Sequence, residues 1–101
     1  MSYRLRLYAY EDASAEELQA AEQRFRTALE TELGDESLVW PVYAAYMKLV
    51  VTYGESPAED VLSSDELEIF NQWQAAELAA VTAALGPNRY MGDAQFEIRP
   101  A

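Results

Sequence analysis

The sequence predicts a compact, helix-rich α+β domain, in which a small two-stranded sheet packs on helices in the approximate order β-α-α-α-β. Three observations predict this class: a strand-like alternation near each end of the chain, three stretches of helical spacing between them, and turn residues that separate these segments. The length of 101 residues suits one domain over residues 1–101, and the hydrophobic half of the composition is enough for a core without disulfides.

Residues 3–10 alternate between two faces, as a β-strand does. Tyr3, Leu5 and Leu7 share one face, whereas arginines and tyrosines share the other. Near the other end, residues 95–99 alternate in the same way, with Phe96 and Ile98 on one face. Because an isolated strand cannot satisfy its own backbone groups, we expect the two strands to pair.

The first helix is predicted to begin after Ser14, because Ser14 and Glu17 have the spacing of a capping box. Its apolar stripe has helical spacing and comprises Leu18, Ala21, Phe25, Ala28, Leu29 and Leu33. The opposite face carries Glu22, Arg26 and Glu30, which have the spacing of i,i+4 ion pairs.

A second helix is predicted over residues 42–53, where the chain is apolar nearly all round. Pro41 suits a first helical turn, and it biases Trp40 away from helical angles. Residues 50–53 fit a strand as well, because periodicity does not separate short apolar strands from helices. We favour the helix, with Gly54 as its end. Such an apolar helix is typical of the middle of a fold or of an interface.

The third helix is predicted to begin after Ser63, which forms a second capping box with Glu66. Its buried stripe comprises Leu67, Phe70, Trp73, Ala76, Ala80, Val81 and Leu85. The pair Gly86-Pro87 then ends the helix.

The chain has no histidine and no cysteine, and its 18 acidic residues against 7 basic ones give a net charge of −11. It therefore lacks an imidazole, a thiolate nucleophile and the soft ligands of zinc and copper. For these reasons we expect no enzyme activity and no cofactor. We also expect no metal site, because the candidate ligands Glu55, Glu59 and Asp60 lack the spacing of a calcium loop. Nucleic acid and anionic membranes are disfavoured as ligands, because both require clustered Lys and Arg.

The acids are concentrated between residues 49 and 88, which hold seven acidic residues and no Lys or Arg. Six of them occupy the loop before the third helix and its first turn: Glu55, Glu59, Asp60, Asp65, Glu66 and Glu68. We expect this cluster to bind a basic protein partner, with Tyr8 and Tyr10 as exposed aromatic anchors. The alternative is that helix capping and a solvated loop account for the acids without any partner.

These properties are typical of a small acidic immunity or inhibitor protein of bacterial or phage type. Such an antitoxin blocks a basic toxin or nuclease-like enzyme by covering its active cleft; a DNA mimic is a variant of this hypothesis. No signal peptide and no membrane-spanning run is visible, so we expect a cytoplasmic location. The alternative function is a homo-oligomeric structural or chaperone-like protein, a phage assembly or secretion accessory factor. Residues 42–53 or an open sheet edge would then form its homodimer surface.

Overall fold

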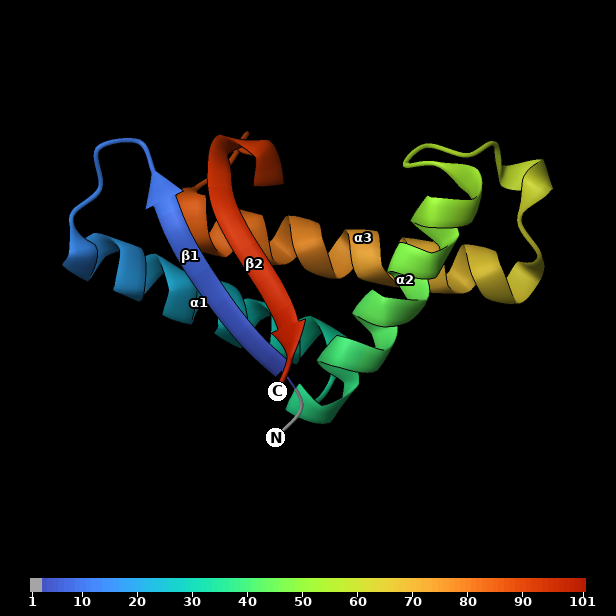
Figure 1. Ribbon diagram of the computed structural model, residues 1–101, viewed down its shortest axis with the longest axis horizontal. Helices are drawn as coiled ribbons and strands as arrows, with labels where there is room; N and C mark the ends of the chain where they lie inside the picture. The colour runs from blue at the N-terminus through green and yellow to red at the C-terminus, as the bar shows by residue number, and fades with distance from the viewer. Residues whose placement is uncertain (1–2) are drawn as a thin grey trace.

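The computed structural model describes residues 3–101, except for the side chain of Glu59, and confirms the predicted class and element order. The elements are strand β1 (Tyr3–Tyr10), helix α1 (Ala15–Leu33), helix α2 (Val39–Tyr53), helix α3 (Ser64–Leu85) and strand β2 (Ala94–Pro100). Short 3-10 helices at Glu36–Leu38, Glu59–Val61 and Met91–Asp93 lie between them. Figure 1 shows the two strands crossing in front of α1 and α3, with α2 beyond β2.

The strands β1 and β2 pair in antiparallel fashion, as expected, with Leu5 opposite Ile98 and Leu7 opposite Phe96. The register shifts between Leu7 and Ala9, so one extra residue is accommodated in β1. The alternation predicted for β1 is confirmed, because the side chains at positions 3, 5 and 7 are buried and those at 4, 6 and 8 are exposed.

The core lies between the inner face of the sheet and helices α1 and α3. Its largest fully buried side chains are Tyr3, Phe25, Leu29, Val39, Trp73 and Val81. The ring of Phe25 on α1 lies 4.2 Å from that of Phe96 on β2, measured between centroids, and this contact joins the sheet to the helices. Small side chains at Ala76, Ala80 and Ala84 are buried on α3, which allows close approach of α1.

Two acids of α1 on the face predicted to lie opposite the apolar stripe instead contact β1. The Glu22 carboxylate accepts the backbone N–H of Leu7 at 3.0 Å, and Glu30 accepts the hydroxyl of Tyr3 at 2.5 Å. Within the described part of the chain neither acid forms the expected ion pair with Arg26, whose guanidinium lies over the Tyr3 ring. The apolar stripe of a helix predicts its buried face, but residues beside that stripe still reach a neighbouring strand edge.

The boundaries of the three helices can be compared with those predicted from the sequence. Ser63 and Glu66 form both bonds of the capping box at α3. At α1 the predicted box is only half formed among the described residues: the hydroxyl of Ser14 accepts the N–H of Glu17, without the return bond from the Glu17 side chain. Residues 50–53 are helical, so the strand alternative is wrong. Helix α2 also includes Trp40, which had been expected to lie outside it. The N–H groups of a first turn have no partner within the helix, so a proline there removes no hydrogen bond.

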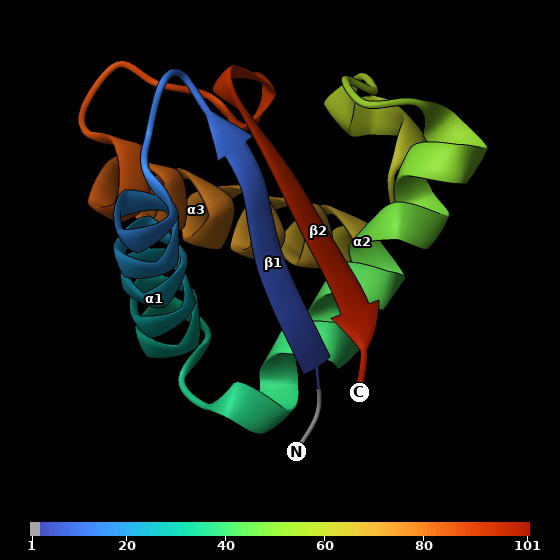
Figure 2. The ribbon, with the colours of Figure 1, turned by 60° about the vertical axis from the view of Figure 1, so that its left-hand side comes forward.

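Helix α2 lies at the edge of the molecule, on the far side of β2 from β1, as Figure 2 also shows. It is attached to α3 through aromatic contacts: the Tyr43 ring lies 4.8 Å from Trp73, and the Tyr46 ring lies 5.1 Å from Phe70. Its outer face stays exposed, and Val51 retains 83% of its accessible surface. Among the described residues, no helix has both the length and the apolar character that crossing a membrane requires.

Candidate protein-binding surface

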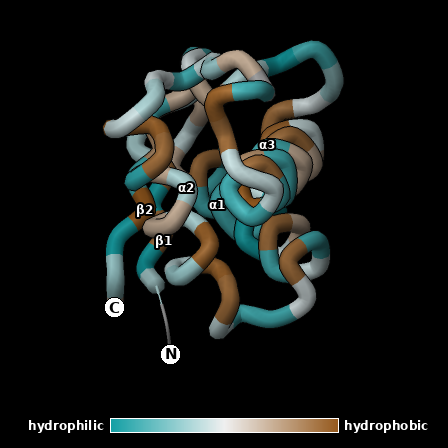
Figure 3. The backbone as a smooth tube through the Cα atoms, turned by 90° about the vertical axis from the view of Figure 1, so that its right-hand side faces the viewer, coloured by the Kyte–Doolittle hydropathy of each residue, from teal (hydrophilic) through white to brown (hydrophobic). Residues whose placement is uncertain are grey.

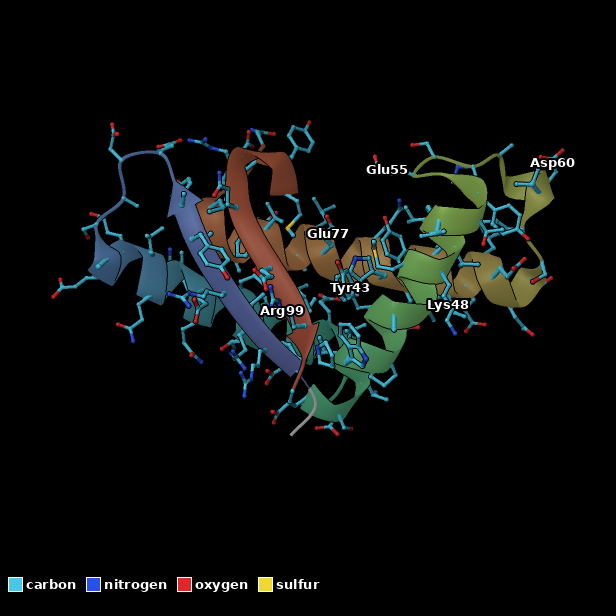
Figure 4. All side chains as sticks on the ribbon, in the orientation of Figure 1. Tyr43, Lys48, Glu55, Asp60, Glu77 and Arg99 are labelled. Atoms are coloured by element: carbon cyan, nitrogen blue, oxygen red, sulfur yellow. The ribbon has the colours of Figure 1, made fainter. Side chains whose placement is uncertain are left out.

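The predicted acidic cluster lies at one end of the molecule, in the connection from α2 to α3 and the first turn of α3; we call residues 54–68 the acidic end. Gly54 ends α2 with a positive φ of 89°, a conformation that glycine adopts without strain. Ser63 begins α3 by capping it. Figure 4 shows Glu55 and Asp60 at opposite ends of this connection.

Most of the acids at this end are available to a partner. The side chains of Glu55, Asp60, Asp65 and Glu68 are exposed. Within the described part of the chain, none of these four forms an ion pair or a side-chain hydrogen bond. Since residues 49–88 contain no Lys or Arg, their charge is not neutralised locally along the sequence.

The other two acids of the predicted cluster have a different status. Glu66 is structural, because its carboxylate accepts the Ser63 N–H at 2.9 Å and the Tyr53 hydroxyl at 3.4 Å. Glu59 belongs to a 3-10 helix, but its side chain lies outside the part of the molecule that the structure describes.

The two tyrosines predicted as anchors lie elsewhere, on β1 in the other half of the molecule (Figure 1). Tyr8 is 46% exposed, and its hydroxyl donates to Glu97 at 2.7 Å. Tyr10 is only partly exposed, and its hydroxyl lies 3.5 Å from the Leu85 carbonyl oxygen. The exposed apolar residue within the acidic end is instead Val61, at 51%. In Figure 3 this end faces the viewer, and hydrophilic and hydrophobic segments are interspersed over it.

A cleft of about 590 Å³ opens beside the acidic end. Helix α3 forms its floor, and the middle of α2, the loop after α2 and the loop before β2 form its walls. The residues that define it include Tyr46, Glu55, Gln74, Glu77, Leu78 and Tyr90. Figure 4 shows Glu77 on α3 in the space between β2 and α2.

Glu77 is the functional candidate that the sequence analysis missed. Its carboxylate accepts the indole N–H of Trp73 at 2.9 Å. Burial raises the pKa of Glu77, the neighbouring Glu55 carboxylate raises it further, and the bond from Trp73 opposes both effects. A signal was present in the sequence, because Glu77 lies four residues from both Trp73 and Val81 and so interrupts the buried stripe of α3.

Replacing Glu77 with glutamine is expected to raise the free energy of unfolding at pH 7. Because the pKa of Glu77 is raised, the folded parent protein favours the neutral form of this carboxyl. The neutral carboxyl therefore contributes fully to the stability of the parent only at low pH. This contribution is lost as the pH rises through the folded-state pKa. The advantage of the variant should therefore shrink as the pH falls toward 4.5, the ordinary value. Urea unfolding at both pH values tests this, and a variant less stable than its parent at pH 7 would contradict it.

Among the described residues, no three carboxylates converge on a point where they could hold a metal ion. Comparison of the chain with protein-family models, with curated proteins and with solved structures finds no match.

Proposed function

We propose that this protein is a small, acidic, non-catalytic inhibitor of the immunity type, which blocks a basic toxin or enzyme by covering its active cleft. The observation that carries the proposal is the acidic end itself. Four exposed carboxylates stand there without partners in the described part of the chain, and an open cleft lies beside them. A cluster of unneutralised charge steers an oppositely charged partner and sets its orientation.

The acidic end would occupy the place where the target binds its own anionic substrate. Glu55, Asp60 and Glu68 are exposed on this end, so they can approach cationic groups that normally contact substrate anions. The exposed side chain of Val61 supplies apolar contact among these charges. An apolar centre with a charged rim is the usual anatomy of a protein–protein interface.

The cleft suits a basic side chain of the partner. The carboxylates of Glu55 and Glu77 both line it, and the rings of Tyr46 and Tyr90 lie in its walls. Arg89 lines it as well, but its guanidinium is paired with Glu11. An arginine guanidinium binds carboxylates in a bidentate manner and packs favourably against aromatic rings. Burial disfavours the charged carboxylate of Glu77 in the free protein, and a bound cation would offset this penalty.

A charge-reversal experiment tests the proposal. The first variant replaces Glu55, Asp60 and Glu68 with lysine, three exposed acids that make no hydrogen bond within the described residues. The matched control makes the same change at Asp12, Glu16 and Glu32, which are exposed outside the acidic end. Both variants carry the same net charge. Each is immobilised, incubated with lysate of the native host at low salt, and eluted with rising salt for mass spectrometry.

We expect the parent and the control to retain one basic protein whose own activity is blocked at equimolar ratio. The acidic-end variant should bind it at least about tenfold more weakly, since each desolvated charge pair in an interface is worth on the order of 1.5 kcal/mol or more. Equal retention by both variants would refute the acidic end as the binding surface. Recovery of the bait alone would refute the inhibitor function.

The exposed face of α2 favours a second candidate function, a homo-oligomeric structural or chaperone-like protein. Trp40, Tyr43, Ala44, Met47 and Val51 line a shallow groove of about 510 Å³ along this face. Apolar surface of this kind is typical of subunit contacts. This function predicts an oligomer that persists at high salt, whereas binding by the acidic end weakens as salt rises.

A further inference from the structure

The outer face of the sheet is a cationic surface on an otherwise acidic protein. Three of the seven basic residues project from it, Arg4 and Arg6 from β1 and Arg99 from β2, together with one acid, Glu97. A recess of about 160 Å³ is lined by these four residues and Tyr8. This face therefore carries a local charge of +2 within a chain of net charge −11.

The backbone pairing fixes how close the arginines stand. Leu7 directs its N–H toward Glu22 on α1, away from β2, so Leu7 and Phe96 form a non-hydrogen-bonded pair. Pairs alternate along an antiparallel ladder, so Arg4 and Arg99, which face each other, form a hydrogen-bonded pair. Their Cα atoms are then about 5.5 Å apart, with both side chains on the same open face.

This arrangement is unfavourable without a ligand, because like charges directly opposite each other destabilise a sheet. Glu97 offsets it only in part, because this one carboxylate pairs with the Arg99 guanidinium, lies opposite Arg6 and also accepts the Tyr8 hydroxyl, which leaves a net excess of positive charge. Arg4 has no ion-pair partner among the described residues, and Arg6 packs over the Tyr8 ring, 5.0 Å from its centroid.

We propose that the outer face of the sheet binds a phosphate group of a small molecule, held by Arg4, Arg6 and Arg99. A phosphate carries two charges and several acceptor oxygens, which suits convergent guanidinium groups better than a single carboxylate does. The acidic residues elsewhere on the protein repel a phosphate only over short distances, because the Debye length is about 8 Å at physiological salt. A small ligand that contacts only this face avoids that repulsion, whereas a polyanion such as nucleic acid extends beyond it.

Thermal unfolding in the presence of inorganic phosphate tests the proposal, with potassium chloride and potassium acetate at matched ionic strength. We expect phosphate to raise the unfolding temperature in a saturable manner, because a ligand that binds the folded state stabilises it. Equal rises in phosphate and in chloride would show ionic screening only and would overturn the site. An equal, saturable rise in acetate would overturn the assignment to phosphate.

Two substitutions should separate binding from folding. Arg4→Gln is expected to stabilise the free protein by removing the repulsion from Arg99, and yet to bind phosphate at least about tenfold more weakly. Lys48→Gln makes the same charge change at an exposed position on α2 and should leave phosphate binding unaltered. Unchanged phosphate affinity in Arg4→Gln, or equal losses in both variants, would overturn the proposal.

Glu97→Gln provides a test of opposite sign. Removing the one acid of this face releases the Arg99 guanidinium and raises the local charge from +2 to +3. We expect phosphate binding to become several-fold tighter, with greater sensitivity to salt. Weaker binding in this variant would show that Glu97 is needed to position the arginines, and would overturn a site formed by the three arginines alone.

Discussion

Replacing Trp73 with alanine should lower the free energy of unfolding by about 3–5 kcal/mol, the range measured for large aromatic residues in protein cores. Trp73 is 1% exposed and is the largest fully buried side chain among the described residues. A domain of this size has a total stability of roughly 5–15 kcal/mol, so the change removes a large fraction of it. Urea unfolding followed by circular dichroism measures the loss.

The loss should be concentrated at α2, because Trp73 provides the main aromatic contact between this helix and α3. The rings of Tyr43 and Tyr46 lie 4.8 and 6.1 Å from it. On α2 itself, the buried residues are Val39 and Leu49. Removing the indole therefore leaves this helix with little buried surface to hold it in place. Amide hydrogen exchange in α2 should then proceed through a local opening, at a lower free energy than exchange in β1.

Trp73→Phe is the matched control, since it keeps an aromatic ring and removes the N–H that Glu77 accepts. Its loss should be clearly smaller than that of Trp73→Ala, and α2 should remain protected. If the amides of α2 and β1 in Trp73→Ala lose protection together, α2 does not open separately, and its attachment does not depend mainly on this residue.

The elements of the fold could be predicted because each depends on local spacing. The strand over residues 3–10 and the stripe of α3 follow directly from alternation and from helical periodicity, and Ser63 with Glu66 marks a helix start. The position of α2 could not be predicted in the same way. A helix that is apolar nearly all round does not indicate which face is buried, so its place at the edge of the molecule depends on Trp73 and Phe70 of α3.

The candidate site was predictable only where charge is contiguous in the sequence. The acids from Glu55 to Glu68 are neighbours along the chain and occupy one connection and the helix start that follows it. The cleft carboxylate of Glu77 comes from the middle of a helix, and it meets Glu55 only because α2 folds back on α3. Likewise, Arg4 and Arg99 come from the two ends of the chain, and strand pairing alone brings them together.

Phe25→Ala should destabilise the protein by a similar amount, about 3–5 kcal/mol, but the loss should affect the whole domain. Phe25 is fully buried, and its ring lies 4.2 Å from Phe96, so it joins α1 to the sheet. We expect all amides of the core, including those of β1, to lose protection in parallel. Urea unfolding and hydrogen exchange of the same variant check both parts of this prediction.

Phe96→Ala is the partner substitution, and it should cost less, because Phe96 is only partly buried before the change. Aromatic pairs contribute about 0.5–1.5 kcal/mol beyond the area that they bury, so the two changes together should cost less than the sum of each alone by that amount. Strict additivity in this double-mutant cycle would contradict the contact as the link between sheet and helices.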